Sequence, residues 1–406
     1  MKEGYLSQYF AGIAIKLLST VEADLFCSHQ HEFNGVNGLK QLFGSAKGKA
    51  SFRAKFVYLR DADVQPITAE GFLTWYDARE KHPTRSEYRL YFPTTSVSLC
   101  ASAGDLLVIG LRPDHSVLVI IAEGGSTISS QICWLFGIDT ERTGFSVRGE
   151  LEREQDKIAF TSTIILEQIG ITVDINEDTY LEEMLYKFNH KFPSTFEFSQ
   201  YARSTLSHIN PLEDADKALL AWAEREEVLF RTLEKHLLAE RLSQGFENDV
   251  DGFLSFSLSV QNRRKSRVGY ALENHLEELF SYYKINYSRT KITENKSKPD
   301  FIFPNIENYH DVTFDPSLLT MLGVKSTCKD RWRQVLSEAD KIEHKHLLTL
   351  EAAISENQTN EMKDKNLQLI VPRFLHETYS KGQQAWLMDL NTFLDLVQKK
   401  ETYTRP

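Results

Sequence analysis

The chain has 406 residues and a formal net charge of −10, with 41% hydrophobic and 26% charged residues. This length and composition indicate a soluble globular protein of two or three domains. They exclude a membrane-spanning class, because no apolar run reaches the roughly 18 residues that a bilayer requires. The N-terminus lacks the apolar region of a signal peptide, so we expect a cytoplasmic protein with no membrane partner.

The charge and the cysteines narrow the possible binding partners and metal sites. An acidic total argues mildly against a nucleic-acid partner, but binding depends on local basic clusters, and two are present, at 262–267 and 328–333. The four cysteines are far apart and form no CxxC pair, so neither a zinc site nor a disulfide framework is indicated.

Residues 1 to about 170 are predicted to be rich in β-structure. Short runs of Val, Ile, Tyr and Phe are separated by Gly, Pro, Asp and Ser, and a helix is predicted at 126–137. Strands at this spacing are typical of a barrel or a sandwich. The predicted strands are 53–60, 87–92, 105–111 and 116–122.

The pattern changes after about residue 180. Apolar residues recur at helical spacing over 214–242 and 267–285, and a further helix is predicted at 330–342. Short apolar runs among these helices predict strands, so this part reads as an α/β domain. The acidic stretch 171–184 is the expected linker, and the predicted strands are 299–304, 320–326, 346–350 and 367–372.

Three charged residues in the second half suggest a chemistry. Asp300 begins one predicted strand, Lys325 ends the next, and Glu338 lies on the following predicted helix. Two carboxylates suit a hard divalent cation such as Mg²⁺, and a lysine beside them suits phosphodiester hydrolysis. Asp, Lys and Glu are abundant, however, so spacing alone does not decide between this site and chance.

The predicted helix 330–342 would join this chemistry to base recognition. Trp332 and Val335 belong to its apolar stripe, and Arg331 lies two turns from Glu338 on one face. Lys329, Asp330 and Arg331 are residue types that pair with guanine and cytosine edges.

Long strings in this half resemble the catalytic half of the EcoRII restriction endonuclease family, within the PD-(D/E)xK superfamily. They are "SVQNRRKSRVGYALENHLEELF", "KPDFIFPNIENYHD" and "VKSTCKDRWRQVLSEADKIEHKHLLTLEAAIS". The resemblance implies a catalytic set of Asp300, Lys325 and Glu338, with the second carboxylate moved off the strand, where Gly323 stands. It also implies an accessory acid at Glu273.

The resemblance further implies a set of DNA contacts. The CC/GG-reading segment corresponds to Lys329, Asp330 and Arg331, and a second DNA-contacting stretch corresponds to Arg263, Arg264, Lys265 and Arg267. Trp222 lies where some relatives hold a residue against a flipped base, although a place in the helix core is the more ordinary reading.

Upstream, the resemblance is thinner. It implies an N-terminal effector domain, a β-pseudobarrel that binds a second copy of the site through His29 and Gln30 and through Arg85, Glu87 and Arg89. Here the arm "TVEADLFCS" has fewer glycines and more acid than the family's arm. The expected domains are an effector DNA-binding pseudobarrel (1–172), a linker (173–190) and an α/β restriction-endonuclease-like catalytic domain (191–406).

The implied function is that of a Type II, specifically Type IIE, restriction endonuclease. It would be a homodimer that makes Mg²⁺-dependent double-strand cuts in DNA at a CCWGG-like site. The N-terminal domain would autoinhibit the nuclease, and a cognate cytosine methyltransferase would act on the same site.

Two alternatives remain at this point. One is a strand-transfer enzyme with a Tyr309 nucleophile, assisted by His310 and the arginines of 331–333; the other is a DNA-binding regulator on the nuclease fold.

Overall fold

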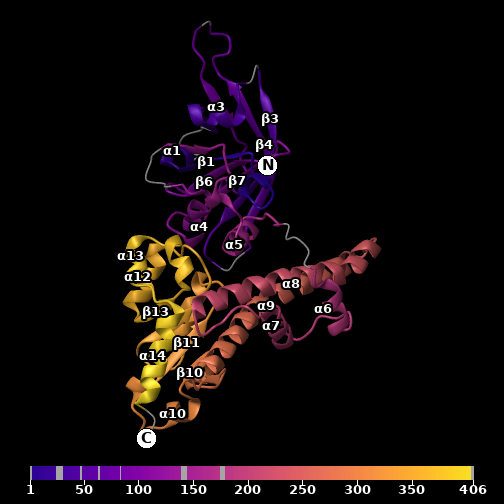
Figure 1. Ribbon diagram of the computed structural model, residues 1–406. Helices are drawn as coiled ribbons and strands as arrows, with labels where there is room; N and C mark the ends of the chain where they lie inside the picture. The colour runs from indigo at the N-terminus through magenta and orange to yellow at the C-terminus, as the bar shows by residue number, and fades with distance from the viewer. Residues whose placement is uncertain are drawn as a thin grey trace. The chain divides into compact units, whose positions relative to one another are not determined.

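A computed structural model describes residues 2–23, 31–45, 48–62, 65–82, 84–138, 144–173 and 179–403. The chain divides into two compact units. The first, here called the β-rich unit, comprises Met1–Val173 and Ala353–Gln358, and the second, here called the α/β unit, comprises Asp174–Ala352 and Thr359–Pro406. Figure 1 labels their elements along the chain. No helix among the described residues is long and apolar enough to cross a membrane.

The β-rich unit is built on one eight-stranded sheet, in the order β2-β5-β4-β3-β7-β6-β1-β8. Neighbouring strands are antiparallel except for the parallel pair β3 and β7. Its elements are η1 (Leu6–Gln8), β1 (Gly12–Leu17), α1 (Thr20–Ala23), β2 (Glu32–Asn34), α3 (Asn37–Phe43), β3 (Ala50–Leu59), β4 (Ile67–Asp77), β5 (Tyr88–Tyr91), β6 (Leu106–Leu111), β7 (Val117–Ala122), α4 (Thr127–Phe136), β8 (Ser146–Arg148), η2 (Glu154–Asp156) and α5 (Phe160–Gln168).

The central strands of this sheet are buried on both faces. Every residue of β6 and β7 is buried. Alternate residues point to two separate cores, one shared with α4 and α5 and the other lined by β2, β4 and β5. The sheet curls around the second core, since the Phe33 ring on edge strand β2 lies 6.0 Å from the ring of Phe145, which precedes the other edge strand, β8.

The α/β unit contains a five-stranded sheet in the order β13-β12-β11-β10-β9. Strands β11, β12 and β13 are parallel, and β9, β10 and β11 are antiparallel. In chain order its elements are α6 (Leu181–Lys187), α7 (Thr195–Ser204), α8 (Ala215–Gln244), α9 (Val250–Tyr282), β9 (Ser288–Arg289), η3 (Glu294–Lys296), β10 (Phe301–Phe303), α10 (Ile306–His310), η4 (Pro316–Leu318), β11 (Thr320–Val324), η5 (Lys329–Arg331), α11 (Trp332–Leu336), β12 (Lys345–Leu348), α12 (Glu356–Asp364, whose first turn groups with the β-rich unit), β13 (Leu367–Ile370), η6 (Arg373–Thr378), α13 (Lys381–Gln384) and α14 (Leu390–Thr402).

The sheet is joined to its helices by an aromatic core. The Phe280 ring of α9 packs edge-on against Phe301 and Phe303 of β10, with ring centroids 5.1 and 5.2 Å apart. Phe303 contacts Phe393 of α14 at 5.8 Å, and Phe393 contacts His346 of β12 at 5.2 Å. Helices α9 and α14 are thereby both packed against β10.

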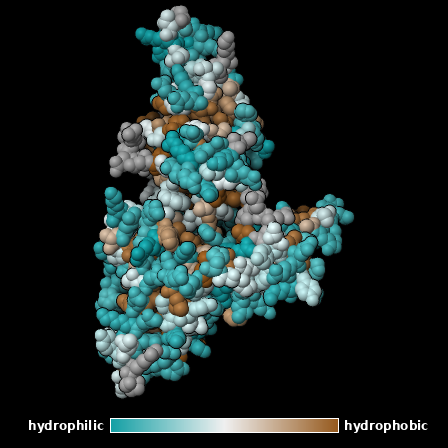
Figure 2. All heavy atoms as spheres, in the orientation of Figure 1, coloured by the Kyte–Doolittle hydropathy of each residue, from teal (hydrophilic) through white to brown (hydrophobic). Residues whose placement is uncertain are grey.

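Helices α8 and α9 form a long antiparallel hairpin that extends beyond the sheet (Figure 1). Asp214 caps α8 through the backbone N–H of Lys217, and Asp249 caps α9 through that of Gly252. The hairpin is longer than predicted, because α9 begins at Val250 rather than 267. Hydrophobic side chains reach the surface toward its free end (Figure 2).

Candidate active site

The site begins at the paired ends of two antiparallel strands. Asp300 immediately precedes β10 and Lys325 immediately follows β11, and the register Phe301↔Leu322 brings those ends together. The Asp300 Oδ2 atom accepts hydrogen bonds from the Val324 backbone N–H at 2.7 Å and from Lys325 Nζ at 3.0 Å. Both charged side chains are therefore held by the sheet itself.

Strand β12 fixes the lysine from the other side. The Lys325 backbone N–H donates to the Leu348 carbonyl at 3.0 Å, which continues the parallel pairing of β11 and β12. The lysine backbone is thus hydrogen-bonded at the point where the strand ends, and its side chain turns to Asp300. Lys325 and Asp300 are mostly buried, so their ion pair is screened less than a surface pair.

Glu338 lies beyond the end of α11 rather than on it. The helix predicted over 330–342 is wrong in length: η5 covers Lys329–Arg331 and α11 ends at Leu336. Ala339, with φ +51°, reverses the chain directly after Glu338. Arg331 and Glu338 therefore do not share a helix face, and the coupling through one continuous helix that the sequence suggested is absent.

The Glu338 carboxylate is half-buried, and its Oε2 atom is buried without a hydrogen-bond partner. Burial raises its pKa to about 7, while the Lys325 ammonium lowers the pKa and the Asp300 carboxylate raises it. These electrostatic effects place Glu338 near both members of the strand-end pair. A buried acceptor without a partner is costly unless something else occupies it.

Position 323, two residues before Lys325, has no room for a side chain. A Cβ built on Gly323 would lie 2.9 Å from Val335 Cγ2 and 3.0 Å from Val335 Cγ1. Helix α11 thus covers the face of β11 where a strand carboxylate would stand. The packing gives a physical reason for a second carboxylate in the turn after α11.

The turn that carries Glu338 is held by residues from three other segments. Lys345 donates from Nζ to the carbonyls of Ala339 at 3.4 Å and Ile342 at 2.9 Å. The Glu294 carboxylate accepts from the Asp340 backbone N–H at 3.3 Å and from the Tyr309 hydroxyl at 2.5 Å. No sequence pattern marks Lys345 or Glu294, because their roles arise only from tertiary contacts.

Tyr309 belongs to this support and not to the reacting groups. Its side chain is 0% exposed, and its hydroxyl donates to Glu294 and accepts from the Lys341 backbone N–H at 3.3 Å. Burial and the neighbouring Glu294 carboxylate hold its pKa well above the usual range. The alternative of a Tyr309 nucleophile is therefore not favoured, because the hydroxyl is buried and hydrogen-bonded.

Glu273 on α9 is paired with an arginine that sequence reasoning missed. Its Oε2 accepts from Arg289 Nε at 3.0 Å and Nη2 at 2.7 Å. Burial, with the Asp300 carboxylate nearby, raises the Glu273 pKa, and Arg289 lowers it. Arg289, on β9, also binds Glu277 and donates to the Asn274 side chain at 3.1 Å. Glu273 thus borders the site with its charge balanced by Arg289.

The donor set fits a hard divalent cation. Among the described residues, no group of three or more His, Cys, Asp or Glu side chains is arranged to hold a metal ion. Asp300 and Glu338 nevertheless influence one another electrostatically, all their donors are carboxylate oxygens, and Glu338 Oε2 has no protein partner. Oxygen donors of this kind are those that Mg²⁺ prefers.

The expected base-reading residues lie between β11 and α11. Lys329 is half-exposed with φ +35°, Arg331 is exposed, and the Asp330 side chain lies outside the described part of the structure. The neighbouring Arg333 instead pairs with Glu361 at 2.6 Å and lies over the Trp332 ring at 4.7 Å. Both arginines are exposed, but Arg333 is held by this ion pair on α11.

The expected DNA-contacting stretch 262–267 lies within α9, and the fold uses most of its arginines internally. Arg264 pairs with Glu234 at 2.6 Å, and buried Arg267 pairs with Glu226 and Glu227 of α8. Arg263 lies 4.1 Å over the Phe192 ring. Lys265 is exposed. In this conformation Arg267 does not reach solvent, which contradicts its direct contact with DNA.

Trp222 is 3% exposed within α8. Its ring lies 5.8 Å from the His275 ring, and the Arg203 guanidinium lies 5.8 Å above it. The structure therefore places Trp222 in the helix core, the more ordinary of the two readings. Stacking on a flipped base would require the side chain to leave this position.

The expected effector residues have mixed outcomes. His29 and Gln30 lie outside the described residues. Arg85 is exposed, whereas Glu87 pairs with Arg79 and Arg89, and Arg89 pairs with Glu32 on β2 at 3.1 Å. Glu87, Arg89 and Glu32 thus form an ion-pair network with Arg79.

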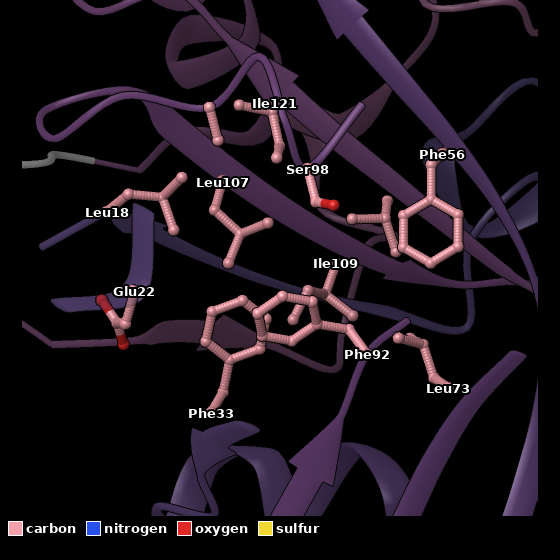
Figure 3. A pocket seen from close by; sticks show the side chains of 12 residues that line it. Leu18, Glu22, Phe33, Phe56, Leu73, Phe92, Ser98, Leu107, Ile109 and Ile121 are labelled. Atoms are coloured by element: carbon pink, nitrogen blue, oxygen red, sulfur yellow. The ribbon is translucent and has the colours of Figure 1, made fainter. Parts of the chain in front are cut away.

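An apolar pocket also lies in the β-rich unit, in the core enclosed by the curled sheet. Figure 3 shows the rings of Phe33 and Phe92 beside aliphatic side chains of β4, β6 and β7, with the Glu22 carboxylate at the edge. Phe33 and Phe92 stack with centroids 4.6 Å apart. Glu22 is paired with Lys16. The lining is nearly all hydrophobic, so we assign no chemistry to this pocket.

Comparison with known proteins gives a specific match in the second half. Residues 230–394 match the family model "EcoRII C terminal". Over 205 residues the chain is 43% identical to the Type II restriction enzyme EcoRII of Escherichia coli. That match spans 50% of this chain and 50% of the relative. It therefore covers about half of each protein.

Solved structures show weaker likeness. Metal-depleted Ecl18kI in complex with uncleaved, modified DNA is 17% identical with a TM-score of 0.44, over 57% of this chain and 87% of the other. The restriction endonuclease PspGI–substrate DNA complex is 18% identical with a TM-score of 0.43, over 52% of this chain and 94% of the other.

Proposed function

We propose that this chain, whose residues 230–394 match the family model "EcoRII C terminal", is a Type II restriction endonuclease that hydrolyses both strands of DNA at a specific site. One observation carries the proposal beyond the similarity. Asp300 and Lys325 are hydrogen-bonded at paired strand ends, beside a Glu338 carboxylate oxygen that has no protein partner.

The division of roles follows from these contacts. Lys325, held by Asp300 and by the β12 backbone, would carry positive charge to the attacked phosphate and stabilise the negative charge that develops there. Because its backbone is part of the sheet, the ammonium would need little reorganisation during the reaction. Asp300 orients that lysine and supplies acceptor oxygens.

Asp300 and Glu338 are the residues that would hold Mg²⁺, with Glu273 accessory to them. When bound, the cation would polarise the phosphodiester and activate a water molecule. Glu338 suits this place because its oxygen is buried and without a partner, and because the Lys345 and Glu294 contacts fix its turn.

The finer features of the family are part of the same proposal. We propose a CCWGG-like site read by Lys329, Asp330 and Arg331, with Arg263 and Arg264 near the DNA backbone, and a homodimer that matches the symmetry of the site. The β-rich unit would be a pseudobarrel that binds a second site as effector and restrains the nuclease. The cognate cytosine methyltransferase would act on the same sequence.

Replacement of the lysine tests the proposal. Lys325→Ala should abolish Mg²⁺-dependent cleavage of DNA that carries CCWGG sites, while specific binding in a gel-shift assay without divalent metal is retained. Lys399→Ala, at an exposed lysine in the last turn of α14, is the matched control and should cleave normally. Wild-type cleavage by Lys325→Ala would refute the assignment, and a wild-type chain that binds but never cleaves would be a regulator on the nuclease fold.

A further inference from the structure

The outer face of α9 near the hairpin's free end carries large hydrophobic side chains in solvent. Val250 is 66% exposed, Leu254 50% and Leu258 57%. They recur every four residues, so they lie on one side of the helix. Figure 2 shows hydrophobic side chains among polar ones on this part of the hairpin. Exposed apolar side chains that form a stripe are characteristic of an interaction surface.

The inner face of α9 is already occupied. Arg264 and Arg267 point to the acidic residues of α8, and Phe253 and Phe256 pack against Phe246 in the hairpin loop, with ring centroids 5.5 and 5.3 Å away. The exposed stripe is therefore separate from the face that holds the hairpin together.

The stripe has the spacing of a helix–helix seam and opposite charges at its two ends. Asp251, Leu254, Leu258, Gln261 and Lys265 follow one another at steps of three, four, three and four residues. Asp251 precedes Leu258 by seven residues, and Lys265 follows it by seven. Asp251 and Lys265 are both exposed. The stripe is thus acidic at one end, apolar in the middle and basic at the other end.

We propose that this stripe, defined by Asp251, Leu254, Leu258, Gln261 and Lys265, is a self-association surface that packs antiparallel against the same stripe of a second copy. A twofold axis at Leu258 would bring the two Leu258 side chains together. It would also place Asp251 of each copy opposite Lys265 of the other, about 10 Å from the centre along the helix. In such an isologous arrangement, the same Asp251–Lys265 ion pair forms at both ends of the paired helices.

A second copy suits the stripe better than an unrelated partner, because the charge order is self-complementary only when the helix is reversed onto itself. A parallel alignment would place Asp251 against Asp251 and Lys265 against Lys265. The inference specifies the dimer included in the proposed function, and in that respect rests on it, but the pairing of the helices can be measured without DNA or cleavage.

The first test disrupts the apolar centre. The full chain should sediment as a dimer at micromolar concentration, and Leu258→Asp should weaken the dimer dissociation constant by at least tenfold. Ser259→Asp is the matched control: it adds the same charge at the next position, about 100° around the helix, and should leave the constant unchanged. A monomeric wild-type chain, or equal effects of the two substitutions, would overturn the proposal.

The second test reads the antiparallel register. Asp251→Lys and Lys265→Asp should each weaken the dimer, whereas the double variant should recover to within about threefold of the wild type, because each new lysine again faces an aspartate. A double variant as weak as the two single effects combined would rule out this register. Lys325→Ala should remain dimeric, so a failed nuclease assignment and a failed interface give different results.

Discussion

Gly323 and Val335 lie so close that the fold has no space for a side chain on β11 at that position. A Cβ at residue 323 would stand 2.9 Å from Val335 Cγ2. The contact packs strand β11, which Lys325 follows, against helix α11, which precedes Glu338. It fixes the distance between these two elements, so the position of the second carboxylate depends on the absence of a side chain at 323.

Gly323→Ala should therefore destabilise the protein by about 1–3 kcal/mol, the usual cost of overpacking a core. Urea unfolding measures this cost, and Val335→Ala in the same chain should recover part of it by removing the two methyl groups in the way. Gly269→Ala is the control, since nothing lies within 4 Å of its Cβ position on α9. If Gly323→Ala and Gly269→Ala changed the free energy of unfolding equally, the close packing of Gly323 against Val335 would be incorrect.

Tyr309→Phe should retain cleavage but lose stability. The substitution removes the hydroxyl that donates to Glu294 and accepts from Lys341, within the support of the Glu338 turn. A buried hydrogen bond lost in this way costs about 1–3 kcal/mol because its partner remains buried. Urea unfolding and initial cleavage rates measure the two effects. Tyr186→Phe, at a tyrosine that is 90% exposed, should change neither.

The strands of the α/β unit were largely predictable from sequence, and the site residues at their ends followed with them. The apolar runs around Phe301–Phe303 and Leu322–Val324 are short and bounded by polar residues, so both their ends and the positions of Asp300 and Lys325 were visible. Strand β4 was missed, because its residues are mostly half-exposed and Gly71 interrupts the pattern.

The environment of Glu338 was not predictable. Nothing in "LSEADKI" marks a helix end, since the run contains neither Gly nor Pro. Helix α11 stops because Lys345, Glu294 and Tyr309 hold the following backbone in a turn, and Ala339 adopts a positive φ within it. Such long-range contacts override local helix propensity. Long-range contacts also explain Arg267. The sequence predicted an exposed DNA-contacting side chain, but Arg267 is buried against the acidic residues Glu226 and Glu227 of α8.

Arg331 and Arg333 form a matched pair for the recognition hypothesis. Both follow the strand end by a few residues, but Arg333 is held by Glu361, whereas the exposed Arg331 stands at the end of η5. Arg331→Ala should reduce discrimination between cognate and single-mismatch sites by roughly 1–3 kcal/mol. Competition binding with the two DNAs measures this difference.

Arg333→Ala should leave that discrimination unchanged. If Arg331→Ala weakened cognate and mismatched DNA equally, Arg331 would be a phosphate contact instead of a base contact.

His346 gives the α/β unit a specific sensitivity to acid. Its imidazole is buried on β12 beside the Phe393 ring, and its Nδ1 atom has no hydrogen-bond partner. Burial, together with the nearby Lys400 ammonium, lowers its pKa from 6.5 to about 4. Between those pH values the unfolded chain binds a proton that the folded chain does not. The free energy of unfolding must therefore fall as the pH drops from about 6.5 toward 4.

Between pH 7 and pH 5 this group alone should remove about 2 kcal/mol of stability, since one unit of pKa shift corresponds to about 1.4 kcal/mol. His346→Gln does not titrate and should lack that part of the pH dependence, as measured by urea unfolding at the two pH values. The exposed His208 provides the control, because His208→Gln should keep the wild-type dependence. Equal pH dependence in wild type and His346→Gln would show that His346 is not buried as a neutral imidazole.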